Sequence, residues 1–98
     1  MNIAIDYDDT YSADPELWQM FIVRAHSRGH NCYIVTCRRD TEENRQEVYG
    51  DADEPSTGLH WGRHLFTGLS AKRWFCEQRG LKIDVWIDDD PACIENGK

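Results

Sequence analysis

The first ten residues join a short apolar run directly to a group of carboxylates. Residues 3–5 are all aliphatic, as in a buried strand of a parallel sheet, and Asp6, Asp8 and Asp9 follow them. Open α/β sheets bind their ligands just beyond the carboxyl ends of such strands. If the strand simply continued, Asp6 and Asp8 would point to the same side, and two charges about 4 Å apart repel by roughly 4 kcal/mol. We therefore expect either a protonated carboxyl group or a cation here.

The same pattern returns near the other end of the chain. Residues 85–87 are apolar, and Asp88, Asp89 and Asp90 come directly after them. If the two strands are parallel neighbours, up to six carboxylates meet at one edge of the sheet. Such oxygen ligands suit Mg²⁺, which takes one or two carboxylates and otherwise keeps water or substrate phosphate. Aspartate is also common in turns and at helix N-caps, so either cluster alone would be a weak signal, but the pair favours a cation.

The composition fits one small globular domain over residues 1–98. With 40% hydrophobic and 11% aromatic residues, the chain can bury a single core and does not belong to the disordered class. The formal net charge is −7, and the six clustered aspartates contribute six of those negative charges. The acidity is therefore concentrated at the predicted site. No basic stripe indicates a nucleic-acid-binding surface.

Targeting and cysteine patterns favour a cytoplasmic protein. The first residues lack the charged and apolar regions of a signal peptide, and no apolar run is long enough to span a membrane. The four cysteines include no C-x-x-C pair. We therefore expect reduced, partly buried thiols rather than a zinc site or a disulfide.

Strands and helices are predicted to alternate along the chain. The predicted strands cover residues 3–5, 32–35, 63–67 and 83–87, and the predicted helices cover residues 12–29, 40–49, 70–80 and 91–96. This order predicts an α/β fold, a three-layer sandwich with a mostly parallel sheet.

Several side chains have expected places in the predicted helices. Asp14, Asp40 and Ser70 stand where N-caps are expected, just before or at the first helical residues. Leu17 belongs to the apolar face of the first helix, and Trp74 is predicted to mark the inner side of the third.

Further polar residues lie where the predicted elements meet the acidic edge. Thr36 ends the second strand, where its hydroxyl is placed to hydrogen-bond a phosphoryl oxygen. Arg38 and Arg39 follow, and a guanidinium matches the geometry of a phosphate, although at least one of the two is expected to be a solvated surface charge. Lys72 lies in the first turn of a helix, where a cation is unfavourable unless an anion occupies that helix end.

The segment of residues 50–62 is irregular, and it contributes a weak metal-binding pattern. His60 and His64 are four residues apart, a spacing that binds a metal on a helix. Gly62 between them weakens a helix, so we do not expect a metal there.

The candidate residues form an ordered set along the chain. In order they read Asp6-x-Asp8-x-Thr10, a strand-terminal Thr36, Lys72, and a strand-terminal Asp88-Asp89. This set resembles the four motifs of the haloacid dehalogenase (HAD) superfamily of phosphohydrolases, across nearly the whole domain. The resemblance implies a Rossmann-like sheet and Mg²⁺-dependent phosphoryl transfer to and from an aspartate.

The resemblance also implies a role for each residue. Asp6 would be the nucleophile, and Asp8 would be the general acid and base. The residues predicted to hold the substrate are Thr10, Thr36, Arg38 and Lys72. The predicted Mg²⁺ ligands are Asp6, Asp8 through its main-chain carbonyl, and Asp88 or Asp89.

The chain departs from the family pattern in two respects. Asp9 replaces the glycine often found in the first motif, as in some nucleotidase-like and polynucleotide-phosphatase-like members, and no cap domain fits in the sequence. We therefore expect an open site, covered by a large phosphorylated substrate, by a second protomer, or by residues 50–62 with Trp61. A nucleotide or a phosphorylated polynucleotide end fits the motif variant, although the charge distribution does not support nucleic-acid binding.

Two other classes of protein share some of these residues. Response-regulator receiver domains carry their acceptor aspartate after the third strand and their lysine last, whereas here an acidic pair comes last. That order argues against a receiver. A non-catalytic HAD-like module that binds Mg²⁺ or phosphate would keep the same residues, so it stays the alternative to a phosphatase.

Overall fold

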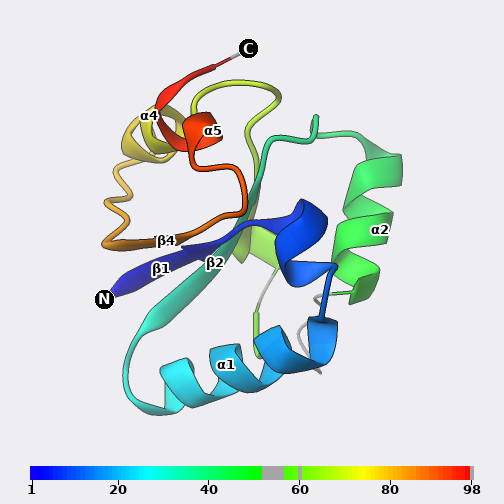
Figure 1. The fold of residues 1–98 in the computed structure, drawn as a ribbon, viewed down its shortest axis with the longest axis vertical. Coiled ribbons are helices and arrows are strands. Elements are labelled where there is room, and N and C mark those ends of the chain that lie inside the picture. Colours follow the sequence, from blue (N-terminus) through cyan, green and yellow to red (C-terminus); the bar gives the residue numbers. More distant parts are fainter. Residues whose placement is uncertain (52–56, 60, 98) are drawn as a thin grey trace.

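Four parallel strands form the centre of the described part of the protein (Figure 1). The computed structural model describes residues 1–51, 57–59 and 61–97. The strands are β1 (Asn2–Ile5), β2 (Asn31–Thr36), β3 (His64–Phe66) and β4 (Val85–Ile87), in the spatial order β3-β2-β1-β4. Every pairing between these described strands is parallel. The predicted α/β class with a parallel sheet is confirmed, and β3 and β4 are shorter than predicted.

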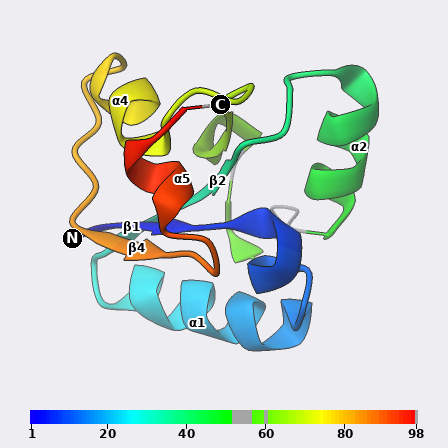
Figure 2. The same cartoon turned by 45° about the horizontal axis from the view of Figure 1, so that its top comes forward.

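Helices lie on both sides of this sheet. They are α1 (Pro15–Ser27), α2 (Glu42–Asp51), α4 (Lys72–Glu77) and α5 (Ala92–Glu95), with short helical turns η1 (Tyr7–Tyr11) and η2 (Trp61–Arg63). Helix α1 lies on one side of the sheet, and α4 and α5 lie on the opposite side (Figures 1 and 2). None of the helices in the described part of the chain is long and apolar enough to cross a membrane.

Alternate residues of β1 face opposite sides of the sheet. Ile3 and Ile5 pack in a cluster that includes Ile22 of α1, whereas Ala4 packs in a second cluster with Cys76 of α4. This is the period of two that a strand imposes on its side chains. Because both faces are covered, β1 reads as a continuous apolar run, and the first polar residue after it falls at the edge of the sheet.

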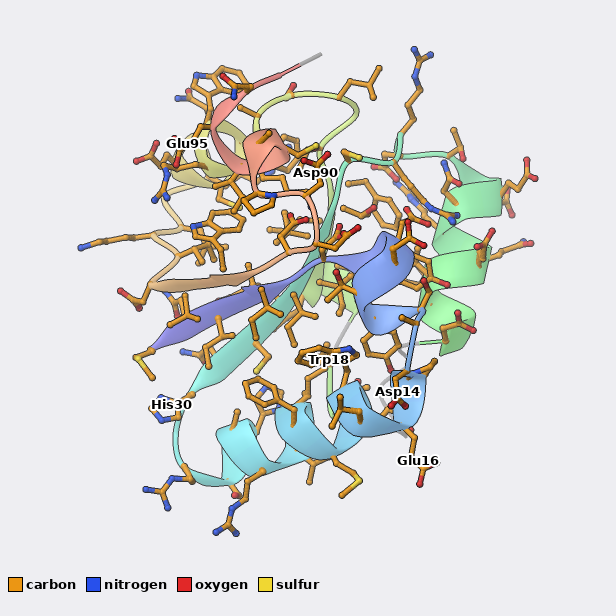
Figure 3. All side chains as sticks on the ribbon, in the orientation of Figure 1. Asp14, Glu16, Trp18, His30, Asp90 and Glu95 are labelled. Carbon is orange, nitrogen blue, oxygen red and sulfur yellow. The ribbon has the colours of Figure 1, made fainter. Side chains whose placement is uncertain are left out.

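The start of α1 is fixed by two side chains (Figure 3). Asp14 caps the helix, as predicted, because its carboxylate accepts a hydrogen bond from the Leu17 main-chain N–H at 3.2 Å. The Trp18 ring N–H donates to the Thr10 carbonyl at 2.8 Å. This bond turns Trp18, and Ile22 one turn later, toward the core. The prediction that Leu17 lies on the inner face is wrong, since its side chain is then on the flank and 51% exposed.

Two of the predicted N-caps are wrong. Helix α2 is capped by Thr41, whose hydroxyl accepts a hydrogen bond from the Asn44 main-chain N–H at 3.2 Å. Asp40 instead binds the Arg45 guanidinium through both carboxylate oxygens, and such a charged two-point contact is stronger than a cap bond. Helix α4 begins two residues after Ser70, and no described side chain caps it.

The rotation of α4 follows from its first residue. Lys72 and Cys76 are four residues apart, so they share one face of the helix, and both are 1% exposed. With that face turned inward, Trp74 points outward and is 55% exposed. The prediction that Trp74 lies on the inner side is therefore wrong, because a charged residue and not an aromatic one decides which face is buried.

The packing of α1 predicts a large loss of stability for one substitution and almost none for its neighbour. Ile22 is fully buried, so Ile22→Ala should lower the free energy of unfolding by about 2–5 kcal/mol. Val23 is 53% exposed on the same helix, and Val23→Ala should change it by less than about 0.5 kcal/mol. Urea unfolding followed by circular dichroism measures both. Equal losses in the two variants would contradict the inward direction of Ile22.

Candidate active site

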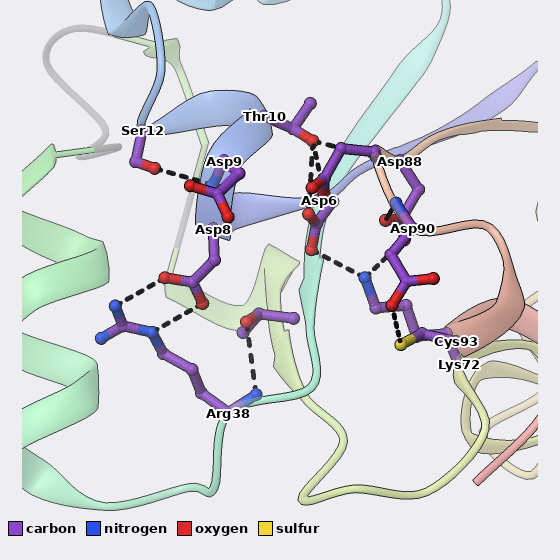
Figure 4. A network of polar contacts seen from close by, with 12 residues as sticks. Asp6, Asp8, Asp9, Thr10, Ser12, Arg38, Lys72, Asp88, Asp90 and Cys93 are labelled. Carbon is purple, nitrogen blue, oxygen red and sulfur yellow. Dashed lines mark hydrogen bonds and ion pairs between the residues drawn. The ribbon is translucent and has the colours of Figure 1, made fainter.

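The carboxyl ends of β1 and β4 bring the two acidic clusters together (Figure 4). Ile5 pairs with Ile87, and the Asp6 main-chain N–H donates to the Ile87 carbonyl at 2.9 Å. Asp6 and Asp88 therefore follow neighbouring strands at adjacent positions. The predicted meeting of the clusters is confirmed for Asp6, Asp88 and Asp89, which offer carboxylate oxygens within 4.8 Å of one another.

A tight turn directly after β1 adds a hydroxyl to this group. The Tyr11 main-chain N–H donates to the Asp6 carbonyl at 3.0 Å, which closes η1. The turn returns Thr10 to the strand end, where its hydroxyl oxygen lies 3.2 Å from Asp6 Oδ2 and 3.3 Å from Asp89 Oδ1. Asp9 takes a φ of 62° in this turn, a left-handed conformation that aspartate tolerates better than most residues. This tolerance explains how an aspartate occupies a left-handed position that glycine adopts most easily.

Lys72 places a buried positive charge between the two strand ends. Its Nζ lies 2.7 Å from Asp6 Oδ1 and 2.6 Å from Asp88 Oδ2, and the residue is 1% exposed. The anion expected near the start of this helix is thus supplied by the protein's own carboxylates. The sequence assigned the neutralising charge to a metal ion, and the structure assigns part of that task to Lys72.

Burial controls the protonation of this cluster. Burial raises the pKa of Asp6 to about 7, with the hydrogen bond from Lys72 opposing the shift and the contact with Asp89 adding to it. The pKa of Asp89 is lowered by the contact of Asp89 with Asp6. Burial would lower the pKa of Lys72, but its hydrogen bonds to Asp6 and Asp88 outweigh that effect and raise it. The lysine therefore stays charged, and Asp6 holds a proton below about pH 7 whereas Asp89 stays ionised.

The donor set of this cluster fits Mg²⁺. Asp6, Asp88 and Asp89 present hard carboxylate oxygens, and two oxygens on opposite sides of one Mg²⁺ ion are separated by about 4 Å. Small side-chain movements would bring the three groups to that spacing. With all three carboxylates ionised, Lys72 leaves two negative charges, which a divalent cation would balance. The carbonyl of Asp8 remains a predicted ligand.

Asp8 and Arg38 form a separate ion pair beside the cluster (Figure 4). Because β1 ends at Ile5, the strand does not continue through Asp8, and Asp8 points away from Asp6. Arg38 donates from Nε to Asp8 Oδ2 at 2.9 Å and from Nη2 to Asp8 Oδ1 at 2.7 Å. Its hydrogen bonds to Asp8, and then to Glu47, raise the pKa of Arg38 above its usual range. Arg38, which was predicted to contact substrate, holds Asp8 in this structure, and Arg39 is exposed.

A small hollow lies over the two groups of charges. Its volume is about 140 Å³, and it is lined by Asp6, Asp8, Asp9, Cys37, Lys72, Asp88, Asp89, Asp90 and Cys93. A hollow of this volume has room for several water molecules. A phosphoryl group fits this space, but a whole nucleotide does not.

Thr36 lies deeper than the predicted role requires. It is 1% exposed, its hydroxyl accepts a hydrogen bond from the Arg38 main-chain N–H at 3.3 Å, and it does not line the hollow. Its neighbour Cys37 does, and so does Cys93, whose thiol contacts Asp90 at 3.2 Å. Sequence reasoning missed both cysteines as lining residues. The position of Cys37 directly after a strand-terminal threonine was the available signal.

Parts of the irregular segment lie outside the described residues. His60 is one of them, so the His60–His64 pattern is not described as a pair. His64 itself is a buried residue of β3, against the Tyr49 ring. The prediction that residues 50–62 cover the site falls partly on residues 52–56 and 60, which are also outside the described part.

Comparison with models of known protein families finds no match to this chain, and searches of curated proteins and of solved structures find none either.

The raised pKa of Asp6 predicts how the metal-free protein responds to pH. Folding raises this pKa from 3.8 to about 7, so the associated stability is fully present below pH 3.8 and is lost as the pH rises through about 7. In a chelating buffer, wild type should lose up to about 1.4 kcal/mol per pH unit relative to Asp6→Asn across this range. Thermal melting of both proteins at several pH values measures the difference. Parallel curves would contradict the buried proton.

Proposed function

We propose that this protein is a Mg²⁺-dependent phosphatase of the HAD type, acting on a phosphomonoester. The observation that carries the proposal is the buried contact of Lys72 with Asp6 and Asp88. It joins a carboxylate nucleophile, a cation for the phosphoryl group and a carboxylate suited to a metal. The proposal includes a Rossmann-like three-layer arrangement without a cap domain and a cytoplasmic location.

The proposed reaction has two halves. An oxygen of Asp6 attacks phosphorus, the bond to the leaving oxygen breaks, and Asp8 supplies the proton for that oxygen. Water then attacks the phosphorus of the aspartyl-phosphate, and Asp8 accepts the water proton. The bond between phosphorus and the Asp6 oxygen breaks, which releases inorganic phosphate and restores the Asp6 carboxylate. Lys72 neutralises charge on the transferred group. Mg²⁺, held by Asp6, Asp88 and Asp89, would supply the remaining neutralisation.

The size of the hollow supports an open site. About 140 Å³ admits the phosphoryl group, so the organic part of the substrate would lie outside the hollow. A large phosphorylated substrate or a second protomer would then exclude water from the metal. A nucleotide or a polynucleotide end remains within the proposed substrate class, and the acidic rim formed by Asp9 and Asp90 disfavours tight binding of a polyanion.

Mg²⁺ should stabilise the folded protein. A ligand of the native state at a hundredfold excess over its Kd adds about 2.7 kcal/mol, which for a domain of this size raises Tm by about ten degrees or more. Thermal scans with and without millimolar Mg²⁺ measure the shift. Asp88→Asn should reduce it, and Asp40→Asn, which changes an aspartate away from the site, should keep it. A shift that survives Asp88→Asn unchanged would count against this metal site.

The two aspartates of the first motif should differ in their effect on turnover. Asp6→Asn should abolish hydrolysis of an aryl phosphate, because the covalent route needs this carboxylate. Asp8→Asn should slow steady-state hydrolysis by about 10²–10⁴-fold. An activated aryl leaving group needs little protonation. The first release of the aryl group by Asp8→Asn should therefore be slowed less than steady-state hydrolysis.

The same assay separates the enzyme from the rival module. A Mg²⁺-dependent rise in Tm without any turnover, or with turnover equal in Asp6→Asn and wild type, would favour a non-catalytic module that binds Mg²⁺ or phosphate.

A further inference from the structure

We infer that Arg38 is a positioning residue that orients Asp8 for the second half of the reaction, the hydrolysis of the aspartyl-phosphate. The inference rests on the proposed function and deepens it. It gives Arg38 a task different from the substrate contact that its sequence position suggests.

The ion pair between Arg38 and Asp8 is a two-point contact. Both oxygens of Asp8 are engaged by Arg38, at 2.7 Å and 2.9 Å, through two different nitrogens (Figure 4). A two-point contact of this kind fixes the plane of a carboxylate as well as its position. The Asp8 side chain is 46% exposed, so packing alone leaves it free to rotate. The guanidinium therefore supplies the orientation that the surrounding protein does not.

Arg38 is itself held in place by residues of α2 and by Tyr7. Its Nη2 donates to Glu47 Oε2 at 2.8 Å and its Nη1 donates to Asn44 Oδ1 at 3.2 Å, both from α2. Its Cζ lies 5.1 Å from the centre of the Tyr7 ring. With the two bonds to Asp8, these contacts use four of the five N–H groups of a guanidinium. Little donor capacity remains for a phosphate.

The residues that hold Arg38 and Tyr7 all belong to one helix. Glu47 and Asn44 belong to α2, and the Tyr7 hydroxyl donates to Asp51 at the end of that helix. Arg38 and the ring beneath it are thus fixed to the same element. The direction of Asp8 therefore depends on α2 through Arg38.

The chemistry of the second half needs this fixed direction. The water oxygen bonds to phosphorus, the bond between phosphorus and the Asp6 oxygen breaks with its electron pair returning to Asp6, and Asp8 takes the water proton. Each Asp8 oxygen has a second lone pair beyond the one used by Arg38, and Asp8 lines the hollow. An oriented base can then meet the water without losing its ion pair. The first half with an activated leaving group makes no such demand.

The test measures how much of the enzyme is phosphorylated during turnover. Arg38→Ala is mixed with an aryl phosphate and Mg²⁺, quenched in acid, and examined by intact mass. Steady-state turnover should fall by about 10–100-fold, the range expected when a catalytic group is misplaced. The phosphorylated fraction should rise above that of wild type, and the first release of the aryl group should keep its rate. A substrate-binding arginine would give the opposite result, with a higher KM and a lower phosphorylated fraction.

Two comparisons make the result specific. Arg45→Ala removes a second two-point arginine–aspartate pair, on the exposed surface, and should leave both measurements unchanged. The double variant Asp8→Asn/Arg38→Ala should be no slower than Asp8→Asn alone, because Arg38 acts through Asp8. Additive losses would overturn the inference.

The outcomes also separate this inference from the proposed function. If wild type and Asp8→Asn form no phosphorylated species, both ideas fail. If they form it and Arg38→Ala does not accumulate more, only the role of Arg38 is overturned. Circular dichroism checks that Arg38→Ala folds. If it does not fold, Glu47→Gln, which loosens Arg38 without removing it, should give a smaller rise of the same sign, and no rise would overturn the inference.

Discussion

The ammonium group of Lys72 is buried between carboxylates that follow two different strands, and most of the site depends on this contact. A buried charge costs several kcal/mol unless it is paired, so Lys72 is stable there only while Asp6 and Asp88 face it. The contact also joins α4 to the end of β4, the next strand along the chain, and to the end of β1, which lies 66 residues away in the sequence. It sets the rotation of α4 and so decides that Cys76 is buried and Trp74 exposed.

The same burial leaves the cluster one charge short of neutrality in the metal-free protein. Lys72 neutralises one carboxylate, and below about pH 7 the raised pKa of Asp6 allows a proton on Asp6 to neutralise another. A divalent cation would replace that proton, because a metal and a proton compete for the same carboxylate oxygens. The metal-free fold and the proposed metal-bound enzyme therefore differ by an exchange of cations at a prepared site.

The sequence predicted the features that local chemistry determines. Apolar runs ending in aspartates gave the strand ends that meet, and Asp14 before Pro15 gave the start of α1. The sequence-based prediction failed where two neighbouring side chains could fill the same role, as Asp40 and Thr41 could at the N-cap of α2. Thr41 caps α2 because Asp40 is taken by Arg45, and no pattern in the sequence records that pairing. The choice between a cap bond and a side-chain pair depends on how the Asp40 and Arg45 side chains are oriented in the folded chain.

Asp6 and Asp8 show how a fold separates two carboxylates that stand two residues apart in the chain. A continued strand would have placed both on one side, where their repulsion would raise the cost of ionising either. Instead β1 ends at Ile5, and the turn directs Asp6 to Lys72 and Asp8 to Arg38. Each carboxylate has its own cation, one buried and one near the surface. Because the two charges are separated in this way, a nucleophile and a base can occupy the same hollow in different environments, which is the condition that the proposed two-step chemistry requires.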